Sequence, residues 1–476
     1  MSLPPAGFPP DQRAAAAGLS PAAGRFLDAV EADPRLLLRR TFEPALAAAR
    51  EVIPTLVGFD PAKPYGLEPW PVLITPERRA ELARTIVGLG RLVRGIPRRF
   101  FAGDAEVVAR YYGLESPLLA AVLLAEPTGI AETICRGDVV DTAGGLRVVE
   151  LNFGNVASWQ DNAVSPAYLR SAPIAGWLAA EGIEPAWDDT AGALIRHAVA
   201  WCAARGRAEG GALDLAVVAA TRGIYGFDNH PLAHYRERFA AALAELAGGR
   251  PGTLHLAGTG DLAFDAKGLM IAGRRIAGVV EELDEVTGRD LFRAFKARRL
   301  ELFTGPIGPL VLGDKRNLAL LSERRGELSP EERDLVDRTV PWTRRVERRS
   351  VERGGVERAL PEMLLADRGA FVLKAATAVG GQGVVVGAFA APEEWRTAVE
   401  RALTEGSWIA QEYLDTPTFP FQAGDEGWTP HRLVWGPFLF GDDFGGLFVR
   451  VLPVAGGPVV NLGRGAQVAL AFTVGA

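Results

Sequence analysis

Several residue types are scarce in this sequence, and each shortage excludes a class of protein. Only two of the 476 residues are cysteine, Cys135 and Cys202, which excludes a disulfide framework and fits a reducing cytoplasm. The longest apolar run, residues 118–125, is far too short to cross a membrane, and the N-terminus lacks the pattern of a secretory signal. The 58 acidic and 52 basic residues give a net charge of −6, which disfavours a broad nucleic-acid surface. We therefore expect a cytoplasmic protein that binds neither nucleic acid nor membrane.

Core-forming residues, in contrast, are abundant. Hydrophobic residues make up 48% of the chain and charged residues 23%, which is the balance of a globular protein. At roughly 150 residues per domain, the length allows two or three domains or one large multilobed unit. Apolar periodicity predicts helices over 12–32, 40–57 and 77–93. Helices and strands alternate over 191–302, and mixed elements follow, so we predict an α/β protein with α+β lobes.

A predicted β-hairpin carries the first group of candidate site residues. Two strand-like segments flank a turn at Gly144-Gly145. Residues two apart on a strand share a face, so Arg136 and Asp138 on one strand can face Glu150 and Asn152 on the other. Two carboxylates and an amide oxygen are hard ligands that suit Mg²⁺ and leave room for phosphate. An ordinary hairpin with a solvated polar face is the alternative.

A lysine followed by a glycine-rich turn carries the second group. In FVLKAATAVGGQGVVVG a predicted strand ends at Lys374, and Gly380, Gly381 and Gly383 form the turn that follows. Glycine amides can approach an anion closely, and a lysine supplies a point charge for phosphate. The spacing differs from the P-loop pattern G-x-x-x-x-G-K, and a plain hairpin with a glycine turn is the alternative.

The use of lysine in this chain is itself informative. Of the 52 basic residues only five are lysines. Two of the five, Lys374 and Lys315, lie where a nucleotide site needs them, and Lys315 begins a predicted helix after a short predicted strand. Gln411 and Glu412 end another predicted strand, where they can border the adenine and the ribose of a nucleotide. In a chain that otherwise uses arginine, these two lysines favour phosphate binding over a solvated surface charge.

With these residues the chain resembles the ATP-grasp superfamily, and specifically its circularly permuted branch, similar to the synthetase domain of glutathionylspermidine synthase. The R-x-D motif, eleven intervening residues and the E-x-N motif match that branch in residue type and spacing, and they precede the lysine segment, as permutation requires. The resemblance implies an ATP-grasp fold with a helical N-terminal region and an inserted α/β domain. The expected parts are a helical region with the magnesium-binding half, a possible substrate-binding α/β domain, and the lysine and glycine-loop half, over 1–190, 191–304 and 305–476.

The resemblance also implies roles for individual residues. The magnesium ligands are Asp138, Glu150 and Asn152. The residues that bind ATP are Lys315, Lys374, Gly380, Gly381, Gly383, Gln411 and Glu412. Two arginines, Arg136 and Arg450, are catalytic, and Asn461 is placed with Arg450 at the phosphates.

The activity that this resemblance implies is an ADP-forming, ATP- and Mg²⁺-dependent ligase. It would join a small-molecule or short-peptide carboxylate to an amine through an acyl-phosphate intermediate. Two alternatives stay open: an ATP-dependent phosphotransferase of the same fold, and a non-catalytic nucleotide-binding protein. The sequence does not indicate the acid, the amine or the oligomeric state.

Two weaker features lie in the middle of the chain. His230 and His234 are four residues apart, a spacing that can hold a metal on a helix, but Pro231 lies between them and favours a polar pair at a helix start. Arg222, Tyr225 and His234 follow a predicted strand, at the position where α/β sheets bind ligands. They are candidates for an acceptor pocket.

Overall fold

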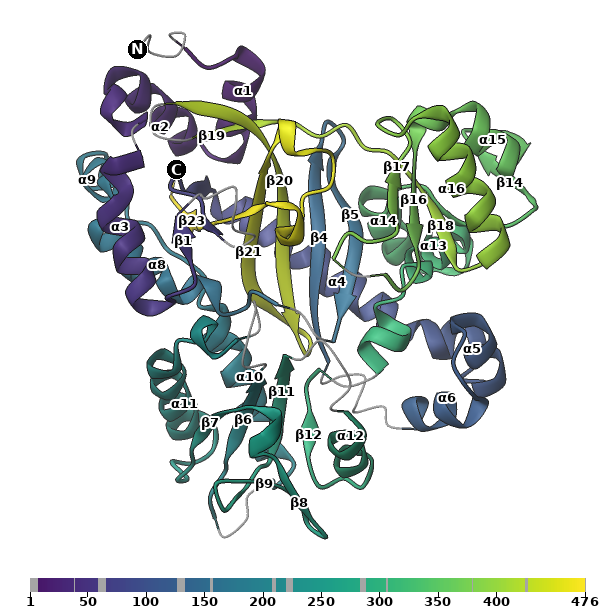
Figure 1. Ribbon diagram of the computed structural model, residues 1–476, viewed down its shortest axis with the longest axis horizontal. Helices are drawn as coiled ribbons and strands as arrows, with labels where there is room; N and C mark the ends of the chain where they lie inside the picture. Colours follow the sequence, from purple (N-terminus) through teal and green to yellow (C-terminus); the bar gives the residue numbers. More distant parts are fainter. Residues whose placement is uncertain are drawn as a thin grey trace.

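The central sheet of the protein combines strands from distant parts of the chain. The computed structural model describes residues 7–37, 39–58, 66–125, 133–154, 157–207, 211–219, 226–282, 288–304, 307–378, 380–423 and 427–475. The strand order of the sheet is β1-β2-β22-β21-β20-β4-β5, and β19 pairs with β20. These strands are β1 (Val57–Gly58), β2 (Gly66–Leu67), β4 (Ile134–Thr142), β5 (Gly145–Phe153), β19 (Phe419–Gln422), β20 (Trp428–Phe440), β21 (Asp443–Pro453) and β22 (Gln467–Ala469). The sheet therefore joins the predicted polar hairpin, β4–β5, to strands almost 300 residues later (Figure 1).

Helices cover the N-terminal region, as predicted. They are α1 (Pro10–Leu19), α2 (Pro21–Ala32), α3 (Arg39–Val52), α4 (Pro76–Phe101), α5 (Ala105–Tyr112), α6 (Pro117–Leu124), α8 (Ser165–Ser171) and α9 (Pro173–Ala180). The predicted helix over 12–32 is two helices, because the Ser20 hydroxyl accepts a hydrogen bond from the Ala23 amide and Pro21 opens α2. Helix α4 packs its buried face behind the central sheet, and β3 (Val72–Ile74) pairs in parallel with β23 (Ala471–Thr473).

A parallel α/β unit lies at the lower end of the central sheet in the view of Figure 1. Its strand order is β12-β11-β6-β7, with every pairing parallel, as the alternation of helices and strands predicts. The strands are β6 (Leu215–Ala219), β7 (Leu254–Ala257), β11 (Gly278–Glu282) and β12 (Glu301–Leu302), and a small antiparallel sheet adds β8 (Ala263–Asp265), β9 (Gly268–Ile271) and β10 (Arg274–Arg275). The helices are α10 (Thr190–Ala204), α11 (Leu232–Leu246) and α12 (Gly288–Lys296).

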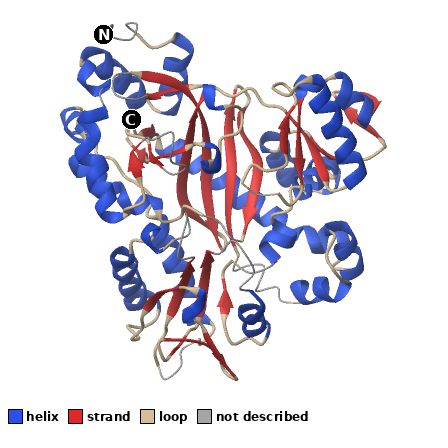
Figure 2. Cartoon of the chain, viewed as in Figure 1, coloured by secondary structure: helices blue, strands red, loops and turns tan. Residues whose placement is uncertain are grey.

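A third part of the molecule covers residues 307–423 apart from β19, and we call it the lysine lobe. It lies beside β5, the edge strand of the central sheet (Figure 2). Its sheet has the order β13-β18-β16-β17. Its elements are α13 (Arg316–Glu323), α14 (Pro330–Thr339), β13 (Thr343–Arg345), β14 (Ser350–Arg353), β15 (Val356–Ala359), α15 (Leu360–Ala366), β16 (Phe371–Ala375), β17 (Val384–Val386), α16 (Pro392–Glu405) and β18 (Trp408–Glu412). Phe371 and Leu373 are buried in the core of this lobe beside Trp395, which leaves the alternating residues Val372 and Lys374 for the opposite face of β16.

Two predicted strands are absent from the described part of the chain. The segment before Lys315 is a π-helical turn, Gly308–Leu312. The apolar residues 459–462, which the sequence also predicts as a strand, lead into a 3-10 turn, Leu462–Arg464. The periodicity of a short apolar run does not tell a strand from such a turn. At Gly308 the close contact with the loop after β5 favours the helical turn.

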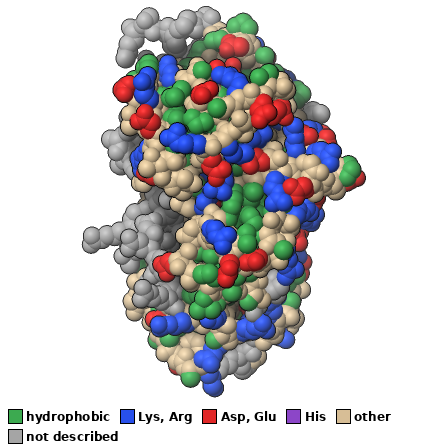
Figure 3. Space-filling view, turned by 90° about the vertical axis from the view of Figure 1, so that its right-hand side faces the viewer, with side chains coloured by type: hydrophobic (Ala, Val, Ile, Leu, Met, Phe, Trp, Pro, Cys, Tyr) green, Lys and Arg blue, Asp and Glu red, His purple; other side chains and the backbone are tan. Residues whose placement is uncertain are grey.

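Two features of the described residues bear on membrane and nucleic-acid binding: the length of the apolar helices and the distribution of charge on the face of the lysine lobe. In the described ranges no single helix is long and apolar enough to cross a bilayer, and α5 and α6, which together reach the required length and composition, are bent by 110° at their junction. Basic and acidic side chains are interspersed over the face drawn in Figure 3.

Replacement of Gly308 by alanine is expected to destabilise the protein by about 1–3 kcal/mol, because the added methyl group would lie 2.7 Å from the Gly154 Cα. Gly154 follows the last residue of β5, so the backbone at Gly308 and the backbone at Gly154 must move apart to make room for the methyl group. Urea unfolding measures the change. The matched control is Gly326→Ala, where a methyl group meets no atom within 4 Å, and equal stability of the two variants would contradict this account.

Candidate functional site

The β4–β5 hairpin brings its four polar residues onto one face. Arg136 is opposite Asn152, and Asp138 is opposite Glu150, in the antiparallel register. Gly137, between the two charged residues of β4, points to the other face, where an added methyl group would meet Ile86 of α4 at 2.9 Å. The convergence expected from the spacing is therefore what the register produces.

An arginine from the last long strand completes this cluster. Arg450 of β21 lies with a guanidinium nitrogen 2.6 Å from an Asp138 carboxylate oxygen, and Arg136 lies 3.8 Å from the same oxygen. Burial alone would raise the pKa of Asp138, but Arg450 and Arg136 outweigh burial and hold the pKa below its ordinary value. Asp138 is thus an anion within a buried cationic cluster, in which Arg136 is its neighbour on β4 and Arg450 comes from a strand about 300 residues later.

The two predicted lysines meet the hairpin from the lysine lobe. The Lys315 ammonium group lies 3.2 Å from the Glu150 carboxylate and donates a hydrogen bond to the Ala378 carbonyl oxygen at 2.6 Å. The Lys374 ammonium group donates to the Val149 carbonyl oxygen at 3.0 Å. Two segments more than 160 residues apart therefore form one charged cluster around Glu150.

Gln411 holds Lys374 in place. The Gln411 side-chain oxygen accepts a hydrogen bond of 2.8 Å from Lys374, and its amide nitrogen donates to the Thr343 hydroxyl at 3.2 Å. Burial and, to a lesser extent, the nearby Lys315 lower the pKa of Lys374 to about 8, against the opposite effect of Glu150 and Asp138. Gln411 thus positions Lys374. The sequence predicts that Gln411 borders the adenine of a nucleotide and does not predict this contact with Lys374.

Asp138, Glu150, Lys374 and Gln411 line a cavity of about 160 Å³ between the central sheet and the lysine lobe. We call it the nucleotide cavity, after the role that the sequence predicts for these residues. Its polar lining includes Asp138, Glu150, Lys374, Gly381, Gln411, Glu412, Arg432 and Asn461. Its apolar lining comes from both sheets and includes Val140, Val149, Val372, Val384, Val386, Leu414, Val434 and Val460. Two facing walls of branched side chains form a slot that suits a planar ring.

The glycine turn borders the same cavity. Gly380, Gly381 and Gly383 all have positive φ, at 65°, 74° and 60°, a conformation that other residues rarely adopt. At Gly383 an added methyl group would also lie 2.8 Å from the Ala375 side chain. Arg464 donates a hydrogen bond of 2.8 Å to the Gly381 carbonyl oxygen. The turn therefore requires glycine, and a residue near the C-terminus holds it beside Lys374.

Three of the predicted residues lie at the edges of this arrangement. Arg136 donates to the Ala157 carbonyl oxygen at 2.8 Å, and Asn152 lies opposite it, two residue pairs along the hairpin from Asp138 and Glu150, which line the cavity. Glu412 lines the cavity and pairs with Arg353 at 3.2 Å.

The donor set suits a magnesium ion only together with phosphate and water ligands. Asp138 and Glu150 face each other across the hairpin. Asn152 lies two residues further along β5, on the same face. The described residues contain no group of three or more His, Cys, Asp or Glu side chains that could bind a metal without other ligands. Mg²⁺ commonly takes one or two protein carboxylates and completes its shell with phosphate and water, so two carboxylates and an amide fit this ion.

Sequence reasoning missed the apolar walls and Arg432. Arg432 of β20 donates to the Val454 and Gly457 carbonyl oxygens at 3.1 and 3.0 Å and so fixes the turn after β21 at the mouth of the cavity. The period of two along β4 places Val140 on the same face as Asp138, which was a usable signal. No comparable pattern pointed to Val434 or to the wall from the lysine lobe.

The histidines do not form a pair. His234 lies 2.9 Å from the Asp189 carboxylate, and the His230 ring lies 2.9 Å from the Tyr235 hydroxyl. Each ring therefore faces a different partner, as expected for polar residues at a helix start. Of the candidate acceptor pocket, Arg222 and Tyr225 lie outside the described residues.

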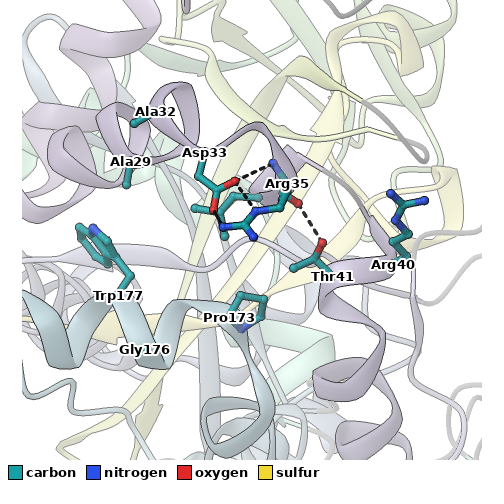
Figure 4. A pocket seen from close by; sticks show the side chains of 10 residues that line it. Ala29, Ala32, Asp33, Arg35, Arg40, Thr41, Pro173, Gly176 and Trp177 are labelled. Carbon is teal, nitrogen blue, oxygen red and sulfur yellow. Dashed lines mark hydrogen bonds and ion pairs between the residues drawn. The ribbon is translucent and has the colours of Figure 1, made fainter. Parts of the chain in front are cut away.

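A larger surface hollow, of about 590 Å³, lies between α2, α3 and α9. Figure 4 shows its residues, among them Trp177 on one side and Asp33 and Arg35 on the other. The Arg35 guanidinium donates to both Asp33 carboxylate oxygens at 2.7 and 2.6 Å, so these two charges neutralise each other. No second titratable cluster lines this hollow among the described residues, and we do not assign it a function.

Comparisons with protein-family models and with curated proteins find no match to this chain. The geometry of the candidate site is therefore the basis for a functional proposal.

Proposed function

We propose that this protein is an ATP- and Mg²⁺-dependent carboxylate–amine ligase of the circularly permuted ATP-grasp type. The observation that carries the proposal is the 3.2 Å contact between Lys315 and Glu150 at the nucleotide cavity, which unites the predicted magnesium segment and the predicted phosphate lysines. The slot of valines gives the adenine an apolar site beside these charges. Cys135 and Cys202 are both buried, and the small number of cysteines supports a cytoplasmic location as part of the same proposal.

The chain's own residues divide the work of binding. Lys315 and Lys374 would contact the phosphates, and Gln411 would keep Lys374 in position. Asp138, Glu150 and Asn152 would hold Mg²⁺, which supplies charge neutralisation between the phosphate oxygens when it is bound. Glu412 would border the ribose. Binding would exchange the Lys315–Glu150 contact for contacts of these two side chains with phosphate and Mg²⁺.

The proposed chemistry has two steps. In the first, a substrate carboxylate oxygen attacks the terminal phosphorus of ATP, and the bond from that phosphorus to the oxygen of ADP breaks. In the second, an amine attacks the acyl carbon, phosphate leaves, and the amine nitrogen loses a proton. Arg136 and Arg450 would stabilise negative charge in both steps, since phosphoryl transfer depends mostly on positioning and electrostatics. The glycine turn would exclude water, which hydrolyses acyl phosphates.

Hydroxylamine provides a test that does not need the natural amine. The full chain is incubated with Mg²⁺-ATP and a panel of carboxylates, with and without hydroxylamine, and ADP and hydroxamate are measured. A ligase is expected to release ADP and form hydroxamate only when carboxylate and hydroxylamine are both present. ADP release with one acceptor and a stable phosphorylated product would identify a phosphotransferase. Nucleotide binding without ADP release under any of these conditions would identify a non-catalytic binding protein.

Nucleotide affinity is expected to fall above pH 8, because Lys374 has a pKa of about 8 and only its ammonium form attracts phosphate. The loss approaches about tenfold per pH unit where the free lysine is mostly neutral. Calorimetry with ADP and EDTA between pH 7 and 9.5 measures it without a metal. Lys374→Met is expected to bind weakly with a flat profile, whereas Lys267→Met, at an exposed position, should keep the wild-type slope. A wild-type slope in Lys374→Met would refute the assignment.

A further inference from the structure

A second polar cavity, of about 210 Å³, adjoins the nucleotide cavity, and Glu412 lines both. It lies where the edge strand β5 and α14 meet β13 and β14 of the lysine lobe. Its residues are Arg147, Ser322, Arg325, Val336, Asp337, Val340, Pro341, Trp342, Arg344, Glu352, Arg353, Gly354 and Glu412. None of its four arginines belongs to the proposed ligase site, so the cavity needs an explanation of its own.

Two of the four arginines have carboxylate partners. Arg325 lies 3.1 Å from Asp337, and Arg353 lies 3.2 Å from Glu412. The remaining acidic residue of the lining, Glu352, accepts a hydrogen bond of 2.8 Å from the Gly355 amide. The acidic side chains of the cavity are therefore already engaged with other groups.

The other two arginines have no carboxylate within 4 Å among the described residues. Arg344 donates to the Ser322 hydroxyl and the Thr343 carbonyl oxygen, both at 2.9 Å. Arg147 donates to the Asp337 carbonyl oxygen at 3.2 Å. Two guanidinium groups, one from the central sheet and one from the lysine lobe, thus line one cavity without a carboxylate in direct contact with either.

The environment of Arg344 fixes its guanidinium in place. Its guanidinium carbon lies 4.6 Å from the centre of the Trp342 ring, which holds the planar group by a cation–π contact. Burial lowers the pKa of Arg344, which Arg349 and Arg325 also lower, while Glu323 and Glu352 act in the opposite direction. A fixed, partly buried fork of N–H donors binds an anion at a small entropic cost, and this geometry matches phosphate oxygens.

We propose that this cavity binds a phosphate-bearing anion, either inorganic phosphate or the phosphate group of a small phosphomonoester, through Arg147 and Arg344. The anion would bridge the edge of the central sheet and the lysine lobe. This site is separate from the nucleotide cavity and does not depend on the ligase activity proposed above.

Titration calorimetry of the full chain at constant ionic strength tests the proposal, with inorganic phosphate and glycerol phosphate as probes. Arg344→Ala and Arg147→Ala are each expected to weaken phosphate binding by about tenfold or more. Arg338→Ala is the matched control, because it removes the same charge from an exposed position on α14. Lys374→Ala, which alters the nucleotide cavity, shows whether the phosphate binds there instead.

The outcomes separate the possible sites. Equal affinity in the wild type and both cavity variants, or no measurable binding, would overturn the proposal. Loss of binding in Lys374→Ala with retention in the two arginine variants would place the anion in the nucleotide cavity and would also overturn it. Thermal melting checks that each variant folds. Arg344→Lys keeps the positive charge but loses the forked N–H donors of the guanidinium group, so it is expected to bind phosphate with intermediate affinity. Tighter binding of glycerol phosphate than of phosphate would identify a phosphomonoester as the ligand, and the reverse would identify free phosphate.

Discussion

Replacement of Glu150 by glutamine is expected to lower ATP turnover by about 10²–10³-fold while the chain still folds. The substitution keeps the shape of the side chain and removes the charge that faces Lys315 at 3.2 Å and Asp138 across the hairpin. The neutral amide lacks the negative charge that attracts Mg²⁺, so the site would bind the ion more weakly and the charge of the transferring phosphoryl group would lose part of its stabilisation. ADP release in the presence of the substrates found by the hydroxamate test measures the effect.

The control for this experiment is Glu357→Gln. Glu357 lies on β15, is exposed, and lines neither cavity. Its variant removes one carboxylate charge and is expected to keep wild-type turnover. If Glu150→Gln also keeps wild-type turnover with an unchanged melting temperature, Glu150 is not part of the reaction site.

Replacement of Arg450 by methionine is expected to cost about 3–5 kcal/mol of stability, because it leaves the Asp138 carboxylate in a buried site without its nearest cation. The side chains of Arg450 and Asp138 are 3% and 16% exposed, so water cannot replace the lost partner well. Urea unfolding at pH 7 measures the loss. The double variant Asp138→Asn, Arg450→Met is expected to recover part of it, since neither charge then remains.

The pH dependence of stability gives a second test of the same pair. In the wild type the pKa of Asp138 is lowered, so its contribution to stability is present above the pKa of the unfolded chain and is lost as the pH falls through the folded pKa. Without Arg450, burial would dominate and raise the folded pKa above the unfolded one. The folded state would then bind more protons, so the destabilisation should be smaller at pH 5 than at pH 7. The same loss at both values would show that Asp138 is not the affected group.

Sequence reasoning located the charged part of the site better than its apolar part. Period-two alternation is a local rule, so Arg136, Asp138 and Glu150 could be placed on one face of a hairpin without knowing its surroundings. The rarity of lysine drew attention to Lys315 and Lys374. The contact between these two groups depends on long-range packing, which spacing cannot predict.

Other features of the fold were hidden for the same reason. The π-helical turn at Gly308–Leu312 depends on a close contact with Gly154, and the wall that contains Val434 depends on β20 pairing with β4. The role of Gln411 follows from its cross-strand neighbours, Thr343 on β13 and Val372 on β16. Arg147 and Arg344 belong to different parts of the chain, and no motif connects them. The features that the sequence did not predict are therefore those that depend on contacts between distant segments.

The pairing of β4 with β20 also has a consequence for biosynthesis. The hairpin emerges from the ribosome early, but its partner strand begins at Trp428, so β4 has an open edge while nearly 300 further residues are made. The lysine lobe has nearby pairing partners and its own buried core, and it can fold while the remainder is still being translated. Assembly of the charged cluster is thus a late event, and the open edge of β4 is a place where nascent chains can pair and aggregate.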